Sequence, residues 1–464
     1  MKQKTSEGWD FYITMLGKYT PLLLAIIIFA HVFVLVKLIY FPYPELFIYP
    51  YLTNSGLKPY SQILDQHFPG LMFLPINLNN LGMNTAETAR LWSISIVIVN
   101  HLLLFFISSR FLKSKIKALL VNILYLIWQP FFEGWVLWID SFLPTILLPT
   151  FYAFVKKRIF MTGLFLGLGV VFKQTLIPLS LILLVYIIWH SRKIRPTLAY
   201  LCGLMIPIAG MLLYIFNIGV LRDFWYWTVV FNLTVFAGTG TSLPNSIGFV
   251  TRPLLVYSGS LLLFFYKDKK VATILFIFLL GSIIGIFDRA DFVHFQPSLP
   301  FAVLATVLGI YQLTKKNNLR IFLLIYFVIA TWWLSIFYRG HIGSKVLFFD
   351  QDTKTLALRI KSYTKPKEKI FIFGSVPHLY QMTDTIPAGD VFVFQFPWFL
   401  KVAEGRILQG IKKDKPNIIV SDRSVKIENQ PIIKFAEEID QYINNNYEFM
   451  EQVGTATILR RKIY

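Results

Sequence analysis

The sequence predicts an α-helical polytopic membrane protein that ends in a small α/β domain, and three observations support this. Of its 464 residues, 55% are hydrophobic and only 15% are charged, whereas soluble domains carry about 25% charged residues. Apolar runs of about 20 residues recur along the chain, and each is long enough to cross roughly 30 Å of hydrocarbon as a helix. After Tyr338 charged residues become frequent, and short apolar runs alternate with a helical stretch.

The apolar runs predict eleven membrane spans. The first, near residues 20–41, is longer than the apolar region of a signal peptide and has no small-residue cleavage site after it, so we expect it to remain as an anchoring span. The other ten lie near residues 89–109, 117–132, 138–155, 159–172, 175–190, 198–217, 248–266, 271–287, 297–313 and 319–338.

The basic residues predict how the chain is oriented. The net charge is +20. By the positive-inside rule, gaps rich in Lys and Arg face the cytoplasm, which places the N-terminus inside and the C-terminal domain outside the cell membrane. Because the charge marks topology and suits an anionic inner leaflet, we expect the lipid bilayer, and not nucleic acid, as its partner. The basic residues occupy alternate gaps between spans, at Lys2 and Lys4, then at 110–117, 156–158, 192–195, 267–270 and 315–320.

The remaining gaps, predicted to lie outside, are long and aromatic. The first, residues 42–88, contains apolar stretches such as LMFLPINLNNLGM, which are too short to span and predict helices along the membrane surface. In the second, residues 217–247, the rings from Phe224 to Trp227 favour the headgroup layer. The stretch ILDQHFPG, residues 63–70, is therefore expected at the outer surface.

Residues 341–464 are predicted to form an extracytoplasmic α/β domain, separate from a transmembrane domain at 1–340. The runs KIFIFG and NIIVSD are typical of strands, and FAEEIDQYINNNY is typical of a helix. The single cysteine, Cys202, excludes an internal disulfide. The Gly-rich run GLFLGLG follows no predicted strand, so it indicates helix packing and not a nucleotide site.

Ionisable and amide side chains gather in the outer gaps and at the outer ends of spans. Charges beside a span are costly to desolvate and are often functional. The candidates are Glu45, Asp65 and His67 in the first loop, Asp140 at the end of the fourth span, Lys173 and Gln174 at the end of the fifth, and Arg289, Asp291 and His294 in the corner DRADFVHFQPSLP.

Three of these stretches resemble a known family. The first outer loop resembles that of GT-C fold, polyprenyl-phosphate-dependent glycosyltransferases over PELFIYPYLTNSGLKPYSQILDQHFPGLMFLP. More narrowly, it is similar to the glycosyltransferase family 39-related group of protein mannosyltransferases and bacterial aminoarabinose transferases. Two further stretches, GLFLGLGVVFKQT and RADFVHFQPSLP, resemble that group's Gly-rich span ending in Lys and its Arg, His and Pro-x-x-Pro corner. The resemblance covers nearly the whole chain.

The resemblance implies an integral membrane glycosyltransferase without a cofactor. A polyprenyl-phosphate-linked sugar would be the donor, and a hydroxyl of a glycan, lipid or protein would be the acceptor, with inversion at the outer face. Such a reaction needs a base for the acceptor proton and cations for the departing phosphate. Glu45 matches the acidic position of the base. Pro44 replaces the family's other acid, so Asp65 is the second candidate for the base.

The substrate-binding assignments follow from the same resemblance. The family's Lys-Pro-Pro motif appears here as HFPG, without a lysine. The phosphate is therefore assigned to His67, Lys173 or Arg289, with Arg289 favoured for its bidentate fork. No metal is assigned, although a metal shared by Glu45, Asp65 and His67 stays open. Gln174, His294 and Asp140 complete the substrate-binding set.

Each candidate also has a structural interpretation that the sequence leaves open. Glu45 could be a solvated cap or an interface residue, and Asp65 could cap a helix that begins near Pro69. His67 could be a packed histidine bonded to backbone, and Lys173 could extend its ammonium to the headgroups.

The same holds for the other candidates. Asp140 could cap a span or orient a neighbour, and Arg289 with Asp291 could form a local ion pair. His101 and His190 lie at or within spans away from the outer face and are interpreted as structural.

Two other functions remain open. A polytopic transporter or lipid flippase should carry ionisable residues near mid-membrane or corresponding broken helices in two halves, whereas the charges here gather at outer span ends. A catalytically inactive relative that binds polyprenyl lipids is the third possibility, because Pro44 departs from the family's acidic pair.

Overall fold

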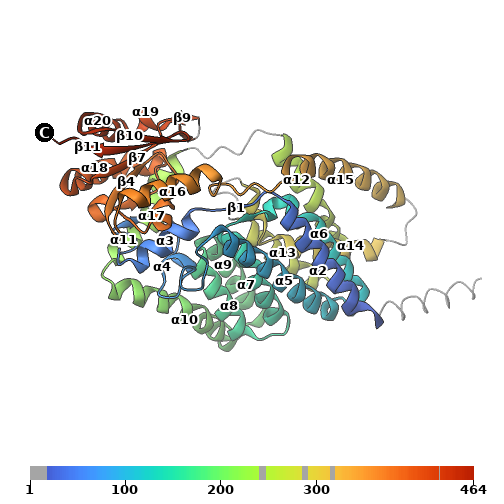
Figure 1. Cartoon of the computed structure of the whole chain (residues 1–464). Coiled ribbons are helices and arrows are strands. Elements are labelled where there is room, and N and C mark those ends of the chain that lie inside the picture. The colour runs from blue at the N-terminus through green and yellow to red at the C-terminus, as the bar shows by residue number, and fades with distance from the viewer. Residues whose placement is uncertain (1–17, 240–246, 285–290, 314–318, 428, 464) are drawn as a thin grey trace, which may run out of the picture. The chain divides into compact units, whose positions relative to one another are not determined.

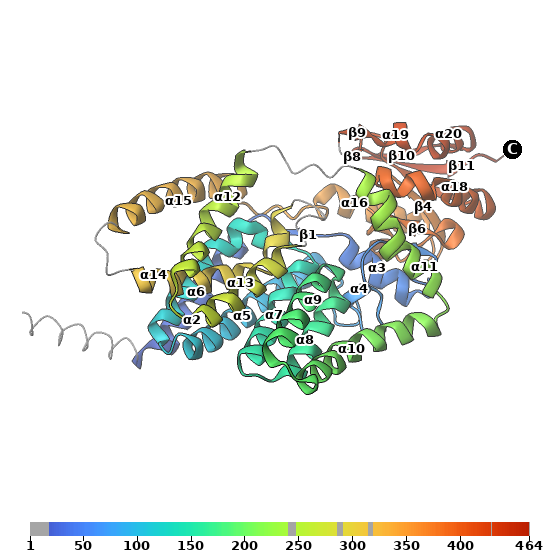
Figure 2. The ribbon, with the colours of Figure 1, turned by 180° about the vertical axis from the view of Figure 1, so that it is seen from behind.

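The computed structural model describes residues 18–239, 247–284, 291–313, 319–427 and 429–463. Figure 1 shows the chain, which is mostly helical, and Figure 2 shows it from behind. Arg289, the favoured phosphate ligand, lies outside the described residues, as do the basic residues Lys2, Lys4, Lys315 and Lys316.

Six helical segments are long and apolar enough to cross a membrane, by length and composition. They are Thr20–Lys37, Ala86–Phe111, Lys115–Gly134, Gln174–Ser191, Ile194–Asn217 and Ile247–Phe265. Shorter apolar helices lie at Ile139–Val155, Ile159–Phe172 and Leu299–Tyr311. With Lys269–Ile283 and Leu319–His341, helical segments occupy every position where a span was predicted. The number that crosses the membrane remains a prediction.

The chain divides into two compact units. The first unit combines Met1–Tyr40, Arg90–Ala209 and Thr241–Lys345, and the second combines Phe41–Ala89, Gly210–Gly240 and Val346–Tyr464. Two boundaries fall inside α5 (Ala86–Phe111) and α10 (Ile194–Asn217). The second unit is therefore larger than the predicted domain at 341–464, because it also holds most of two predicted outer loops.

Bulky aromatic side chains form part of the core of the first unit. Phe151, Phe278 and Phe301 are fully buried, with ring centroids 5.3 to 5.6 Å apart. The helices of this unit are α2 (Thr20–Lys37), α6 (Lys115–Gln129), η1 (Pro130–Gly134), α7 (Ile139–Val155), α8 (Ile159–Phe172), η2 (Gln174–Leu176), α9 (Ile177–Ser191), α12 (Ile247–Tyr257), η5 (Ser258–Phe265), α13 (Lys269–Ile283), η7 (Phe292–Phe295), α14 (Leu299–Leu313) and α15 (Leu319–His341), besides most of α5 and α10.

The glycines of GLFLGLG let two helices approach closely. A Cβ atom at Gly163 of α8 would clash with the backbone carbonyl of Tyr200 on α10, and one at Gly167 would clash with that of Leu204. In return, Gly203 of α10 faces the carbonyl of Phe160. The prediction that this run serves helix packing is confirmed, since only glycine leaves room for backbone at these positions.

The second unit contains the predicted C-terminal sheet. Its strand order is β10-β11-β7-β4-β5, with β4 (Lys369–Phe373) parallel to β5 (Ile386–Pro387) and β7 (Ile418–Ser421). The hairpin of β10 (Tyr447–Val453) and β11 (Ala456–Arg461) joins β7 antiparallel. The predicted strands KIFIFG and NIIVSD are β4 and β7, and both are almost wholly buried.

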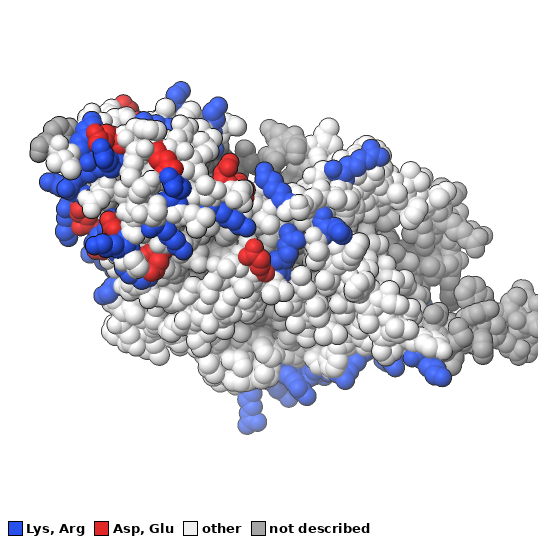
Figure 3. Space-filling model, in the orientation of Figure 1, with Lys and Arg blue, Asp and Glu red and all other residues white. Residues whose placement is uncertain are grey.

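The other elements of the second unit cover this sheet or belong to the loops. Figure 3 shows acidic and basic side chains mixed over the C-terminal region, whereas the helical region is mostly white. The helices are α3 (Glu45–Asn54), α4 (Gly70–Phe73), α11 (Leu221–Trp225), η3 (Tyr226–Phe236), η4 (Ala237–Thr239), α16 (Gln351–Tyr363), α17 (Leu379–Thr383), η8 (Ala388–Asp390), α18 (Pro397–Asp414), α19 (Ile432–Phe435) and α20 (Glu437–Asn446), and the short strands are β2 (Ile63–Leu64), β6 (Phe392–Val393), β8 (Lys426–Ile427) and β9 (Gln430–Pro431), besides β1 (Phe41–Pro42).

The first outer loop differs from its prediction. The run LMFLPINLNNLGM forms no helix beyond the single turn of α4, because Pro75 follows it and asparagines bond to the backbone instead. Asn77 is fully buried and donates to Asn54 at 2.8 Å. The longer helix of this loop is α3, and its residues from Glu45 to Leu52 are all buried.

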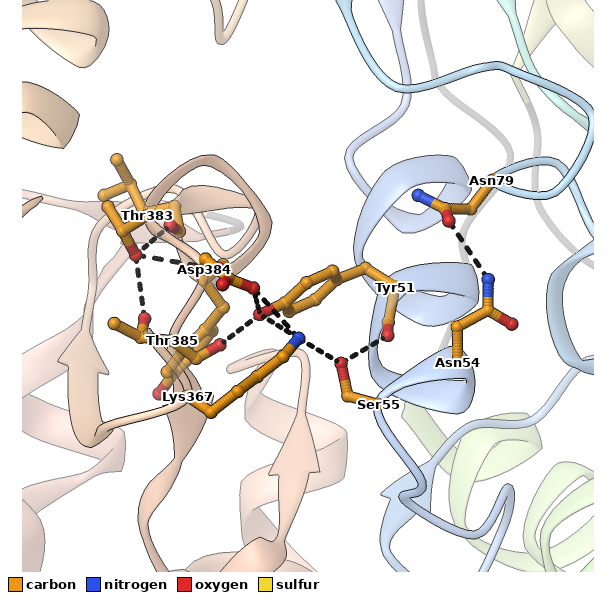
Figure 4. Close-up of polar contacts among 10 residues, drawn as sticks. Tyr51, Asn54, Ser55, Asn79, Lys367, Thr383, Asp384 and Thr385 are labelled. Carbon is orange, nitrogen blue, oxygen red and sulfur yellow. Dashed lines mark hydrogen bonds and ion pairs between the residues drawn. The ribbon is translucent and has the colours of Figure 1, made fainter. Parts of the chain in front are cut away.

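The first outer loop is tied to the C-terminal elements inside this unit. Strand β2 pairs in parallel with β6. Figure 4 shows a second connection, in which the Tyr51 hydroxyl donates to Asp384 and to the Thr385 carbonyl, both at 3.0 Å. Lys367 approaches from the same side and bonds to Ser55 at 3.1 Å. Residues more than 300 positions apart thereby stabilise one fold.

Candidate functional site

Asp65 lies within a hydrogen-bonded group in the second unit. It is buried, with 2% of its surface exposed. The Tyr49 hydroxyl donates to Oδ2 at 2.6 Å, and the backbone N–H of His67 donates to Oδ1 at 2.8 Å. The His67 ring also contacts Oδ1, through Nδ1 at 2.9 Å. The interpretation of Asp65 as the cap of a helix near Pro69 is wrong, because α4 begins without a side-chain cap.

The Asp65 contacts determine the state of the His67 ring. An ionised carboxylate only accepts hydrogen bonds, so the proton of the shared contact resides on His67 Nδ1. The ring is partly exposed, at 18% of its side-chain surface. The His67 ring is thus held by the Asp65 carboxylate.

Glu45 is the first residue of α3, and it is buried. Its interpretation as a solvated cap is therefore wrong. Tyr49 stands one turn later and is fully buried. Burial, followed by the nearby charges of Asp65 and Glu45, raises the pKa of the Tyr49 hydroxyl well above its usual range. Asp65 accepts a hydrogen bond from this hydroxyl, and Glu45 lies one helical turn before Tyr49 on α3.

Sequence reasoning missed the two tyrosines of this group. Tyr60 is fully buried and donates to the His67 carbonyl at 3.0 Å. Both tyrosine rings pack against Phe73, at 4.9 and 5.4 Å. The available signal was the spacing of Glu45 and Tyr49, four residues apart in ELFIY, which places them on one helix face.

A second group of predicted residues meets inside the first unit. Lys173 Nζ lies 2.6 Å from Asp140 Oδ2, and His294 Nδ1 lies 2.9 Å from the same oxygen. The ammonium and the ring are 3.1 Å apart. The three side chains come from the end of α8, the first turn of α7, and η7, and all are buried.

The burial of this group decides between the interpretations of its members. Lys173 is 2% exposed, so it does not extend to headgroups. Its positive charge is already compensated by Asp140, which weakens its assignment as a phosphate ligand. Removing water from two charges is costly and is offset only by close contact, as here. Gln174 begins η2 next to Lys173 and is half-buried.

Two further charged residues near these elements were missed. Glu133 adopts a left-handed backbone conformation, with φ 57°, and its carboxylate accepts the N–H of Val293 at 2.9 Å. The Arg252 guanidinium lies over the rings of Phe131 and Phe292, 4.8 and 4.6 Å from their centroids. Each of these two residues is a single charge inside an apolar run, PFFEGW or GFVTRPLLV, and this pattern could have identified them from the sequence.

The structure places His101 in a buried polar chain of the first unit. His31 and His101 meet through Nδ1 and Nε2 at 2.8 Å. His31 Nε2 lies 2.9 Å from Gln129 Oε1, and His101 Nδ1 lies 2.8 Å from Asn122 Oδ1. Since amide oxygens only accept, these three contacts need three N–H groups on two rings. Two neutral rings carry only two N–H groups, so the oxygen and nitrogen of one amide are exchanged and its NH₂ group donates to the pair.

The predicted site residues thus form two groups, one in each unit. Glu45, Asp65 and His67 belong to the second unit, whereas Asp140, Lys173 and His294 meet in the first. Within the described ranges no three His, Cys, Asp or Glu side chains are grouped so that they could hold a metal ion. Asp291 precedes η7, but its pairing with Arg289 lies outside the described residues.

No family model matches the chain, and no curated protein matches it.

Proposed function

We propose that the protein is an integral membrane glycosyltransferase. It moves a sugar from a polyprenyl-phosphate donor to a hydroxyl of a glycan, lipid or protein acceptor, with inversion at the anomeric carbon. The observation that supports this best is that two buried carboxyl groups lie beside Tyr49: Asp65 accepts a hydrogen bond from its hydroxyl at 2.6 Å, and Glu45 begins the same helix one turn earlier. A carboxylate close to the reacting atoms can take the proton of an acceptor hydroxyl as a general base.

Glu45 is proposed as the base and Asp65 as the residue that positions the site. A base needs a lone pair directed at the acceptor proton, and the Asp65 carboxylate already accepts three hydrogen bonds. Asp65 instead holds the Tyr49 hydroxyl and the His67 ring in place. The partly exposed His67 is proposed to bind the substrate.

Arg289 remains the proposed ligand of the lipid phosphate. We assign the group of Asp140, Lys173 and His294, with Gln174, to substrate binding, as the family resemblance implies.

The proposed step is a single displacement. Glu45 accepts the proton of the acceptor hydroxyl, and the acceptor oxygen attacks the anomeric carbon. The bond from that carbon to the phosphate oxygen breaks, and the lipid phosphate leaves with the electron pair. The products are the glycosylated acceptor and a polyprenyl phosphate.

The test is release of polyprenyl phosphate from a panel of polyprenyl-phosphate sugars by the purified full chain. We expect Glu45→Gln to lower the rate at least about 100-fold, since general-base catalysis contributes about 10²–10⁴. Asp65→Asn should lower it less and should also weaken donor binding. Glu448→Gln, an exposed carboxylate of the C-terminal sheet, is the matched control. Full turnover by Glu45→Gln would overturn the role of Glu45, and no turnover by any form would overturn the proposal.

Transport across the membrane is the second candidate function. It is favoured by the His31–His101 pair, because ionisable side chains buried within predicted spans are typical of transport pathways. Its test is uptake of protons or lipid flipping in vesicles that contain the chain. A proton flux that disappears in His101→Gln, without loss of folded protein, would favour the transporter.

A further inference from the structure

A cavity of about 590 Å³ in the first unit is not used by the proposed reaction. It lies where the ends of α5, α6, α7, α13 and α14 come together. Four basic residues line it, Arg110, Lys113, Lys117 and Lys156. Its volume falls within the range of about 300–1,000 Å³ found for ligand sites.

Among the described residues, a single carboxylate lines this cavity against four cations. Asp268 is the one acidic residue among the described residues that line it. Its carboxylate accepts the N–H of Val271 at 3.2 Å and caps α13. Within the described parts of the chain, none of the four cations forms an ion pair.

Aromatic rings lie against three of the four cations, namely Arg110, Lys117 and Lys156. The Arg110 guanidinium lies 3.6 Å from the centroid of Phe106 and donates to the Tyr152 hydroxyl at 3.0 Å. Lys117 Nζ lies 4.4 Å from the centroid of Tyr311. Ring faces attract cations without using their hydrogen-bond donors, so donors are left for an anion. Four like charges around one cavity also repel one another until an anion enters.

The walls of the cavity indicate which kind of anion fits. Phe151 is fully buried, and Ile107, Val155 and Leu308 add further apolar surface beside the cations. A charged end next to an apolar wall matches a phospholipid, with its phosphate at the cations and its acyl chains along the helices. Basic pockets between membrane helices bind such headgroups on the cytoplasmic side. The predicted orientation places these gaps on that side.

We propose that this cavity binds the phosphate of an anionic phospholipid. Topology alone requires only that basic residues lie in cytoplasmic loops. It does not require that side chains from residues 110–117, 152–156 and 266–271 converge on one cavity with an apolar wall. The proposal is independent of glycosyl transfer, since it uses none of the residues of the proposed reaction.

The test uses the full chain in detergent, with binding of phosphatidylglycerol and cardiolipin measured by native mass spectrometry against phosphatidylcholine. We expect tighter binding of the anionic lipids, and about thirtyfold weaker binding by the double variant Arg110→Gln/Lys117→Gln, since each cation contributes roughly five- to sixfold. The matched control is Lys193→Gln/Arg195→Gln, which removes one Lys and one Arg from a predicted cytoplasmic gap that does not line the cavity.

The other outcomes would overturn the proposal. Equal losses in both double variants would indicate general surface charge and no site. Binding of glycerol phosphate or inorganic phosphate as tight as that of the lipids would indicate a soluble phosphate ligand. Lys156→Gln serves as a further variant if the double variant elutes as an aggregate, and it should weaken the binding of the anionic lipids several-fold. Unchanged binding by this variant would contradict the proposed site.

Discussion

Among the described residues, the ion pairs of the first unit are buried, whereas those of the second unit, apart from the contact of Asp65 with His67, are partly or largely exposed. In the described part of the first unit, the pairs of Asp140 with Lys173 and His294 join side chains that are 3 to 8% exposed. In the second, pairs such as Arg460–Glu448 join side chains that are 62% and 43% exposed. Water screens the exposed pairs, whereas the buried charges depend on each other. Similar distances therefore predict very different effects of mutation.

The largest expected effect comes from breaking the buried group. Asp140→Asn leaves the Lys173 ammonium buried without its carboxylate, and we expect a loss of about 3–5 kcal/mol in the free energy of unfolding. Thermal and denaturant unfolding of the full chain in detergent measures it. The double variant Asp140→Leu/Lys173→Met should recover most of the loss, because it removes both charges. If Asp140→Asn lowered the free energy of unfolding by less than about 1 kcal/mol, the buried pair would behave like an exposed one and the distinction would be wrong.

A buried histidine of the second unit is the next test. His378 donates through Nε2 to the Phe348 carbonyl at 2.8 Å, and burial lowers its pKa to about 4. Between pH 6.5 and about 4 the unfolded chain binds a proton that the folded chain does not, so stability falls as the pH falls through this window. The contribution of neutral His378 to the free energy of unfolding is fully present above pH 6.5, and we expect about 2–3 kcal/mol of it to be lost as the pH falls to about 4.

Unfolding of the full chain as a function of pH, followed by hydrogen exchange in peptides from residues 369–373, checks this effect. His378→Gln keeps a side-chain donor for the Phe348 carbonyl but cannot bind the proton. We expect its stability to change less between pH 6.5 and 4. The same slope in both proteins would show that other groups cause the pH dependence.

A smaller effect is expected at the partly exposed network of Figure 4. Lys367 Nζ lies 2.9 Å from Asp384, 3.2 Å from the Tyr51 hydroxyl and 3.1 Å from Ser55. Lys367→Gln should cost about 1 kcal/mol or less, because these side chains are about half exposed. Faster hydrogen exchange around Tyr51 would accompany it. A loss as large as that of Asp140→Asn would remove the distinction between buried and exposed pairs.

The smallest effect is expected at Arg460. Arg460→Gln removes its contact with Glu448 at 2.7 Å across the β10–β11 hairpin. The change in unfolding free energy should be about 0.5 kcal/mol or less and should vanish at high salt. The measurement is the melting temperature at low and high ionic strength. A cost that persists at high salt would argue that the pair is shielded from water.

Much of the fold could be predicted because local patterns dominate it. The long apolar runs located the helices, and the short apolar runs KIFIFG and NIIVSD located β4 and β7. GLFLGLG was correctly interpreted as a packing surface. Prediction failed in the first outer loop, where Pro75 and the asparagines compete with helix formation and α3 is buried on all sides. Burial of α3 depends on contacts with residues such as Asp384, which the sequence order does not reveal.

For the site, composition predicted which residues carry charge but not how they are grouped. Asp140, Lys173 and His294 are 33 and 121 positions apart, and only the packing of α7, α8 and η7 shows that Asp140 compensates Lys173. Asp65 and His67 were both chosen from one short motif, whereas Tyr49, which binds Asp65, was overlooked because tyrosine is common in apolar helices.

The sequence by itself determined the helical class, the positions of the apolar helices and the C-terminal strands, since these depend on periodicity and hydrophobicity over short windows. The tertiary structure alone decided which charges are compensated and which are not. It paired Lys173 with Asp140, attached three donors to Asp65, and left the cations around Arg110 facing aromatic rings. The physical reason is that the energy of a charge depends on its burial and its partners, and both are properties of the folded chain.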